Sequence, residues 1–471
     1  MDSKVFAQRK SVFWRIHLWA AFIATPFAFI GALTGMLYIF TPQIEAVLHG
    51  DLDRVTPAAT RLSLDALVAL AQRAAPEGTS LRYVVTPDRA DQSVRVYFGA
   101  ATKTVATTVA TKTETSAAKD GEHAEHQATG VKEAAVVAST PALKMDHRIP
   151  QGSIVYLNPY TGDVLGTQGE MDRFSTWSKR LHSSLLQGND WRWLLELSTS
   201  WLLVMLLTGI YLWWPRGGQG IWPHQGLKAR VGWQQWHAFG GVALSIITLI
   251  VLTTGLTWSR YSGAQIKALA DAVGQSTPET PKGLRSQSPP NPQPLLQWQQ
   301  VWDAAQPQAP SISYQITPPK QASDVWRITN FDRSQPTKRF TLLMDSYSGQ
   351  GLYYQSWESL TLFNKATAVG IPFHRGEFGW WNQALLLVFG LGIMWGLISG
   401  WVMFFKRKRQ GVLGLPRLMP EAWRSVPLPA WLIGLALLPA MPVWAWSAGA
   451  ICLIEVWLTW RSSRTWALLA R

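Results

Sequence analysis

Four histidines of this 471-residue chain stand at repeated distances before a hydroxyl–glycine dipeptide. Two of them precede it by 17 residues, and the other two by 25 or 26. The four combinations are His17 with Thr34-Gly35, His237 with Thr254-Gly255, His182 with Thr208-Gly209 and His374 with Ser399-Gly400. Neutral imidazole is a strong axial ligand for haem iron, so two matched histidine pairs are what two b-type haems would require. A single histidine at a helix end is more often an interfacial side chain, and only the matched set favours ligation.

Long stretches without Asp, Glu, Lys or Arg surround these histidines. A membrane-spanning helix needs about 20 apolar residues, so the sequence predicts four spans within 16–44, 198–214, 231–259 and 378–405. A fifth uncharged stretch, 425–454, contains Pro439 and Pro442, which disfavour one continuous helix. We expect a helical hairpin at about 428–441 and 443–460, with a single kinked helix as the alternative.

The composition limits the class of protein. Only 15% of the residues are charged and 47% are hydrophobic, whereas soluble domains carry about 25% charged residues. The single cysteine, Cys452, excludes an intramolecular disulfide and a multi-cysteine metal site. Because no Cys-x-x-Cys-His motif occurs, covalent c-type haem attachment is excluded as well.

The net charge of +14 predicts the orientation. Sixteen basic and two acidic residues account for all of it, in segments 1–15, 215–236, 406–424 and 461–471. These segments share one side if the first four spans alternate and the last two helices form a hairpin. By the positive-inside rule that side is the cytoplasm. The sequence thus predicts a multi-pass membrane protein, and the charge requires no nucleic-acid partner.

Two large segments, 45–176 and 260–373, fall on the opposite side. Both show the alternating polarity of strands, and 156–163 resembles 343–350, each with a strand before a tight turn. The chain therefore reads as two copies of helix, outer segment, helix. Residues 100–140 are rich in Ala, Thr, Lys and Glu and predict a disordered insert.

The repeat sorts the histidines by depth. His17 and His237 are expected at the cytoplasmic ends of the first and third spans. His182 and His374 are expected at the outer ends of the second and fourth, beside short connections at 177–181 and 370–373. Candidates for pairing with haem propionates are Arg15, Arg192, Lys228, Arg230 and Arg375, although interfacial anchoring is the commoner role. Candidates for walls of an acceptor site beside the outer pair are Trp177, Tyr353, Tyr354 and Trp357, although packing is the commoner role.

Several short motifs resemble the PepSY-associated transmembrane proteins. They are Trp-Arg-Ile-His at 14–17, Leu-His-Ser-Ser-Leu-Leu-Gln-Gly at 181–188, Thr-Gly-Ile-Tyr-Leu-Trp-Trp-Pro-Arg at 208–216, Trp-His at 236–237 and Pro-Phe-His-Arg-Gly-Glu-Phe-Gly at 372–379. The resemblance covers roughly 10–405 and includes FoxB-like ferric-siderophore reductases, so it implies a location in the bacterial inner membrane. It implies two non-covalent b haems and reduction of siderophore-bound iron in the periplasm. The 100–140 insert and the C-terminal hairpin depart from the family pattern.

The expected fold is an α-helical integral membrane protein with a four-helix haem-binding core, a C-terminal helical hairpin and two α+β periplasmic PepSY-like domains. The predicted boundaries are 1–44 (N-terminus and span one), 45–176 (first periplasmic domain), 177–214 (span two with its lead-in), 215–236 (cytoplasmic loop), 237–259 (span three), 260–373 (second periplasmic domain), 374–405 (span four), 406–426 (basic loop), 427–460 (hairpin) and 461–471 (tail).

The expected function is a haem-dependent transmembrane oxidoreductase that reduces ferric siderophores. No Gly-x-Gly-x-x-Gly follows a predicted strand, so no NAD(P) or flavin site is expected, and the donor would be a quinol or a separate reductase. One alternative is a non-enzymatic PepSY anchor or adaptor that regulates a periplasmic partner, which predicts a protein without haem absorption. Another is a di-haem reductase of a different periplasmic acceptor. A transporter would suit the repeat, but the first four uncharged stretches offer no acid for a coupling ion.

Overall fold

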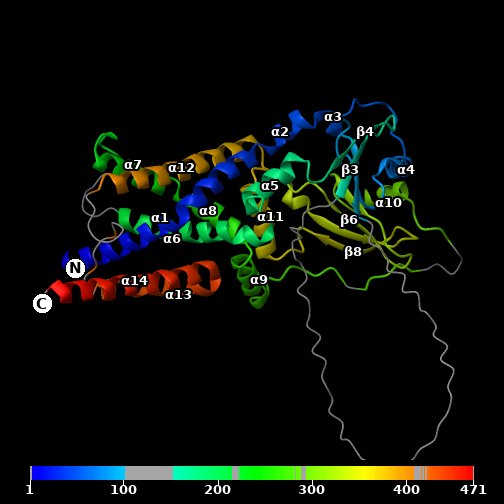
Figure 1. Cartoon of the computed structure of the whole chain (residues 1–471). Helices are drawn as coiled ribbons and strands as arrows, with labels where there is room; N and C mark the ends of the chain where they lie inside the picture. The colour runs from blue at the N-terminus through cyan, green and yellow to red at the C-terminus, as the bar shows by residue number, and fades with distance from the viewer. Residues whose placement is uncertain are drawn as a thin grey trace, which may run out of the picture.

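The computed structural model describes residues 3–100, 152–214, 222–281, 283–287, 293–407, 415, 418 and 422–469. Helices form a bundle at one end of the molecule and a β-sheet lies at the other, with both termini at the end of the bundle far from the sheet (Figure 1). The expected disordered insert at 100–140 lies outside the described residues, apart from Ala100 at the end of a strand.

Three helical stretches of the described residues are long and apolar enough to cross a membrane. They lie in α1 (Ser3–Ile39), in η1 (Asn189–Arg192) continued by α6 (Trp193–Trp213), and in α12 (Trp380–Phe405). The span expected at 231–259 is broken instead, because α7 (Arg230–Ala243) and α8 (Ser245–Leu256) meet at an angle of 60°. Leu244 at the break packs closely on α12, where a Cβ at Gly392 would lie 2.0 Å from its Cδ1.

Two of the four histidines lie on helices of their own, in contrast to the predicted boundaries. His182 belongs to α5 (Phe174–Ser184) and His374 ends α11 (Leu362–His374), so the predicted short connections are helical. The chain turns between α11 and α12 at Gly376 and Gly379, whose φ values are 74° and 88°. Only glycine adopts such values without strain, and they prevent the fourth span from starting at residue 374.

The last two helices are separate. α13 (Leu428–Ala440) and α14 (Pro442–Leu469) are divided at Met441, whose φ and ψ are −131° and 76°. The two helices lie side by side as a hairpin (Figure 1). The hairpin packs on α6, where the indole nitrogen of Trp201 donates to the hydroxyl of Ser447 at 2.9 Å.

The two outer segments share one antiparallel sheet rather than forming two domains. Its strand order is β4-β3-β2-β1-β5-β6-β7-β8. The first half holds β1 (Thr79–Val85), β2 (Val94–Ala100), β3 (Gly152–Leu157) and β4 (Val164–Gly169). The second half holds β5 (Tyr314–Thr317), β6 (Trp326–Asn330), β7 (Phe340–Met344) and β8 (Gly351–Ser356). β1 pairs with β5, Val84 opposite Ile316, so neither half leaves that edge unpaired.

One hydrophobic core serves both halves of the sheet. Leu64 and Leu67 of α4 (Leu64–Ala74) join Val301 of α10 (Trp298–Ala305) in the same buried cluster as the strands. The carboxylate of Asp65 in α4 accepts a hydrogen bond from the backbone N–H of Trp298 at 2.7 Å. This contact satisfies a free donor at the start of α10, so each half of the repeat stabilises the other.

Five short helices remain in the described part of the chain. They are α2 (Thr41–Leu48), α3 (Gly50–Asp53), α9 (Ser262–Ala272), η2 (Pro336–Lys338) and η4 (Ala422–Ser425). α2, α3 and α9 lie between the bundle and the sheet, η2 lies between β6 and β7, and η4 packs on α1 within the bundle. The similar stretches 156–163 and 343–350 form equivalent turns. Gly162 and Gly349 each donate an N–H to a carbonyl four residues earlier, with φ values of 81° and 70°. Backbone geometry therefore explains why the turn occurs in both halves of the repeat, and no functional role is needed.

Candidate functional site

The four histidines form two facing pairs at different depths of the bundle. His182 of α5 faces His374 of α11 next to the sheet, and we call these two the sheet-proximal pair. His17 of α1 faces His237 of α7 farther away, and we call these two the sheet-distal pair. In both pairs the ring centroids are 6.4 Å apart, with interplanar angles of 49° and 87° respectively.

Each of the four imidazoles contacts one hydroxyl through Nδ1. The four contacts are His17 with Thr208 at 3.0 Å, His182 with Thr34 at 3.0 Å, His237 with Ser399 at 2.8 Å and His374 with Thr254 at 3.1 Å. Every contact joins two different helices. The hydroxyl of one helix therefore holds the histidine of another: α6 holds His17 of α1, and α1 holds His182 of α5.

The hydroxyl hydrogens are already committed to the helix backbone. Thr34 donates to the carbonyl of Ile30 at 2.8 Å and Thr208 to that of Val204 at 2.8 Å. The other two behave alike, with Thr254 donating to Ile250 at 2.8 Å and Ser399 to Gly396 at 3.1 Å. Each hydroxyl oxygen is thus left to accept a hydrogen bond from Nδ1–H. We assign the proton of all four rings to Nδ1 on this ground, which leaves the lone pair on Nε2.

A glycine follows each hydroxyl residue and makes room for the imidazole. A Cβ at Gly35 or Gly255 would lie 3.3 Å from Cε1 of the facing histidine, and one at Gly209 would lie 3.2 Å from Cε1 of His17. The corresponding distance from Gly400 to His237 is 3.7 Å, which is an ordinary contact. Three of the four dipeptides therefore need glycine for the close approach of the ring.

The spacing of each pair fits one metal ion with two axial imidazoles. Two such rings have centroids about 6.3 Å apart, because a metal–imidazole bond is about 2.0 Å and a ring with bonds of about 1.33 Å has a radius of about 1.1 Å. Nowhere in the described part of the chain do three or more His, Cys, Asp or Glu side chains gather in a group that could hold a metal ion. A group that brings its own equatorial ligands and needs two protein nitrogens is the kind that fits.

The two pairs are separated along the bundle. Thr34 marks the depth of His182 on α1, and it lies 17 residues after His17 on the same helix. At about 1.5 Å per residue this gives roughly 25 Å along the helix axis. That separation is comparable to the hydrocarbon thickness of a bilayer, about 30 Å.

A carboxylate of the C-terminal hairpin lies beside the sheet-distal pair. Glu455 accepts hydrogen bonds from Arg15 at 2.9 and 2.5 Å and from the indole nitrogen of Trp19 at 2.5 Å. Arg15, predicted as a propionate partner, is therefore bound by this carboxylate. Arg230, at the start of α7, keeps a buried Nε without a hydrogen-bond partner among the described residues. The other distal candidate, Lys228, is exposed ahead of α7.

The sheet-proximal pair has a different arginine neighbour. Arg375 follows His374 directly, donates to the phenol of Tyr38 at 2.8 Å and pairs with Glu377 at 2.8 Å. Burial raises the pKa of Glu377, while Arg375 opposes that shift. Arg192 donates to the carbonyl of Trp258 at 2.7 Å.

The structure does not bring the predicted aromatic wall together. Trp177 packs on Phe174 of its own helix α5. Tyr354 stacks on Phe340 across the sheet, Tyr353 pairs with Leu343 in β7, and Lys365 lies over the ring of Trp357. No ring contact joins any of these four to His182 or His374 in the described part of the chain. Trp177 and Tyr354 remain 40% and 46% exposed, so a part for them in an acceptor site stays a prediction.

Sequence reasoning used the hydroxyl–glycine dipeptides only as markers of the repeat and missed their contact with the histidines. The signal was present, since a hydroxyl next to a glycine recurs four times in otherwise apolar helices. Glu455 was also missed. It is the acidic residue of the last helix, and an acid within an apolar helix is a functional candidate by default.

Comparison with known proteins agrees with this architecture. The family described as the PepSY-associated TM region matches residues 14–407, a stretch that contains all four histidines and both halves of the sheet. No curated protein matches the chain. Because the match covers most of the sequence and the structure combines apolar spans with a separate sheet, this membrane-associated chain belongs to the PepSY-associated TM region family.

Proposed function

We propose that the chain carries electrons across a membrane through two non-covalent b-type haems and delivers them to a ferric siderophore on the sheet side. The sheet-distal pair would hold one haem and the sheet-proximal pair the other. When bound, haem iron supplies a reversible one-electron couple within the bundle. The observation that carries the proposal is the fourfold arrangement in which a hydroxyl holds Nδ1 and leaves Nε2 for a metal.

The residues of the chain have distinct parts in this activity. The four histidines would bind the haem irons, and their hydroxyl partners orient the rings and fix the tautomer. Apolar side chains of α1 and α6, such as Ala24 and Trp201, pack between the two depths and exclude water. Arg230 is the remaining distal candidate for a propionate, because its buried Nε has no partner among the described residues.

The direction of transfer follows from charge and from the position of the sheet. Basic segments such as 1–15 adjoin the sheet-distal pair, which favours the cytoplasm for that end. A quinol or a separate reductase would supply the electrons there. A quinol loses two electrons and two protons, and so reduces two ferric ions to ferrous ions. Hard oxygen ligands of a siderophore suit Fe(III) better than Fe(II), so reduction promotes release of the iron.

Haem content is the first test. We expect two b-type haems for each full-length chain purified after haem-replete expression, measured as the pyridine haemochrome and extractable with acidified organic solvent. A double variant, His17→Ala with His182→Ala, should contain none. Less than one haem in the unaltered chain would refute the di-haem proposal and favour the PepSY anchor or adaptor.

The acceptor is tested separately by stopped flow. The dithionite-reduced protein should be reoxidised by ferric siderophores, with rates that differ from one chelate to another. The matched control is the gallium(III) complex of the same siderophore, which binds alike but accepts no electron. If ferric siderophores oxidise the haem bands no faster than buffer does, the chain is a haem protein with another acceptor.

A further inference from the structure

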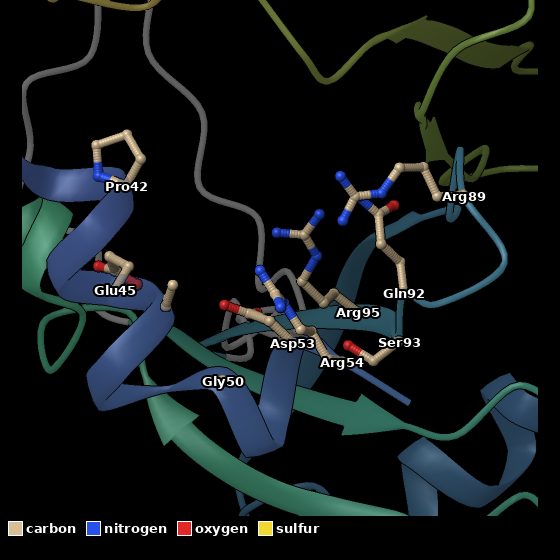
Figure 2. A pocket seen from close by; sticks show the side chains of 10 residues that line it. Pro42, Glu45, Gly50, Asp53, Arg54, Arg89, Gln92, Ser93 and Arg95 are labelled. Carbon is tan, nitrogen blue, oxygen red and sulfur yellow. The ribbon is translucent and has the colours of Figure 1, made fainter. Parts of the chain in front are cut away.

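A small cavity lies where the chain passes from the bundle to the sheet. It encloses about 200 Å³ between α2, α3 and the start of β2. Since a water molecule occupies about 30 Å³, the space suits a small anion with some water. The guanidinium groups of Arg54, Arg89 and Arg95 turn toward this same space (Figure 2).

Two of these arginines have no carboxylate partner among the residues that the structure describes. Arg54 makes no side-chain hydrogen bond or ion pair among the described residues, and Arg95 only covers the ring of Phe331 at 4.9 Å. Arg89 pairs with Asp91 at 3.0 Å, but both side chains are largely exposed. Such surface pairs are weak, so Arg89 can be shared with a ligand.

A buried hydroxyl points to a ligand independently of the charges. Ser93 lines the cavity and is 3% exposed. Its Oγ is buried and has no hydrogen-bond partner in the described part of the chain. An unpartnered buried hydroxyl is unfavourable, and an anion in the cavity would accept its hydrogen bond.

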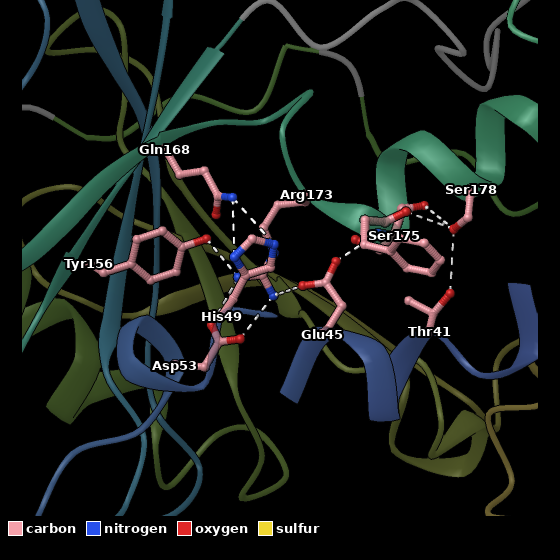
Figure 3. A network of polar contacts seen from close by, with 10 residues as sticks. Thr41, Glu45, His49, Asp53, Tyr156, Gln168, Arg173, Ser175 and Ser178 are labelled. Carbon is pink, nitrogen blue, oxygen red and sulfur yellow. Dashed lines mark hydrogen bonds and ion pairs between the residues drawn. The ribbon is translucent and has the colours of Figure 1, made fainter. Parts of the chain in front are cut away.

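The two acidic residues of the cavity wall share one arginine. Arg173 donates to both oxygens of Asp53 at 3.2 and 2.9 Å and pairs with Glu45 (Figure 3). Burial would lower the pKa of Arg173, but Asp53, Tyr156 and Glu45 more than offset this and raise it. Arg173 is therefore a permanent counterion that offsets one of the two negative charges. The one that remains is outweighed by the three arginines that face the cavity.

We propose that Arg54, Arg89, Arg95 and Ser93 form a binding site for a phosphate-type oxyanion. Arginine forks match the oxygens of a phosphate group in a bidentate manner. The source can be a phospholipid headgroup or free phosphate. A lipid is accessible because Pro42 of the cavity lies three residues past the end of α1, and Val47 and Leu48 of α2 are 85% and 59% exposed. The site does not depend on the haems.

The test uses the full chain in detergent with two probes. Inorganic phosphate is titrated by calorimetry, and phosphatidylglycerol is counted by native mass spectrometry. Arg54→Gln and Arg95→Gln should each weaken binding about tenfold or more, because a hydrogen bond to a charged group contributes about 1.5–3 kcal/mol. Arg327→Gln, an exposed arginine on β6 with the same loss of charge, is the matched control and should bind normally.

The outcomes separate the two sources and the failure of the proposal. Binding of both probes identifies a phosphate site open to free anions, and binding of the lipid alone identifies a headgroup site. Either kind of binding must weaken about tenfold or more in the two cavity variants, while their melting temperatures stay unchanged. If neither probe binds, or if binding is indifferent to Arg54 and Arg95, there is no such site.

Discussion

The sheet-distal and sheet-proximal histidine pairs are alike in their geometry and unlike in their surroundings. Both have ring centroids 6.4 Å apart and hydroxyl partners at 2.8–3.1 Å. The arginine near the distal pair is bound by Glu455 of the C-terminal hairpin, and the one near the proximal pair by Glu377 between α11 and α12. The repeat thus duplicates the histidines and their hydroxyl contacts, while non-repeated residues set the charge around each pair.

Replacement of a single histidine should produce the largest difference between the two pairs. We expect His374→Ala to lose the sheet-proximal haem alone, which leaves the distal haem reducible but stops delivery to the acceptor. His237→Ala should lose the distal haem and stop uptake of electrons from the donor side. Haem content and redox difference spectra measure both effects, each as a loss of one haem in two. A variant that retained both haems with unchanged spectra would contradict its assignment as a ligand.

The carboxylates Glu455 and Glu377 should each affect only one of the two pairs. Glu455→Gln should release Arg15 and Trp19 and loosen the hairpin, with a loss of about 1–3 kcal/mol for a partly buried pair. Its spectral change should be confined to the distal haem. Glu377→Gln is the matched substitution beside Arg375 and should alter only the proximal haem. Thermal melting and the two haem potentials check this, and a change at the wrong haem would disprove the assignment of charges to sites.

The glycines give the smallest and most local effect. Gly209→Ala would place a methyl group 3.2 Å from the His17 ring, whereas Gly400→Ala would keep an ordinary 3.7 Å from His237. Alanine otherwise favours a helix by about 1 kcal/mol, so only the first substitution should be harmful. We expect about fivefold faster haem loss for Gly209→Ala, a difference of about 1 kcal/mol, measured by transfer to apomyoglobin. Equal loss rates in the two variants would show that the ring has room to move.

Much of the sheet could be predicted from polarity alone, but its unity could not. The strands expected within 45–176 and 260–373 do occur there, β1 to β4 in the first segment and β5 to β8 in the second. The alternation of polar and apolar residues indicates which face of a strand is buried, but it does not indicate which strand pairs with it. The pairing of Val84 with Ile316 joins segments more than 200 residues apart, and that contact turns two expected domains into one.

The sequence by itself determined the apolar spans, the two-copy organisation and the four matched histidines. Long uncharged stretches indicate the helices, and the repeated histidine spacing indicates the two copies. Only the tertiary structure decided which hydroxyl holds which ring. His17 and Thr34 share one helix and lie roughly 25 Å apart along it, so they cannot touch. The partner of each histidine must come from another helix, as Thr34 does for His182 and Thr208 for His17. Residue spacing along the chain reveals the repeat, whereas the contact between each histidine and its hydroxyl depends on how the helices pack.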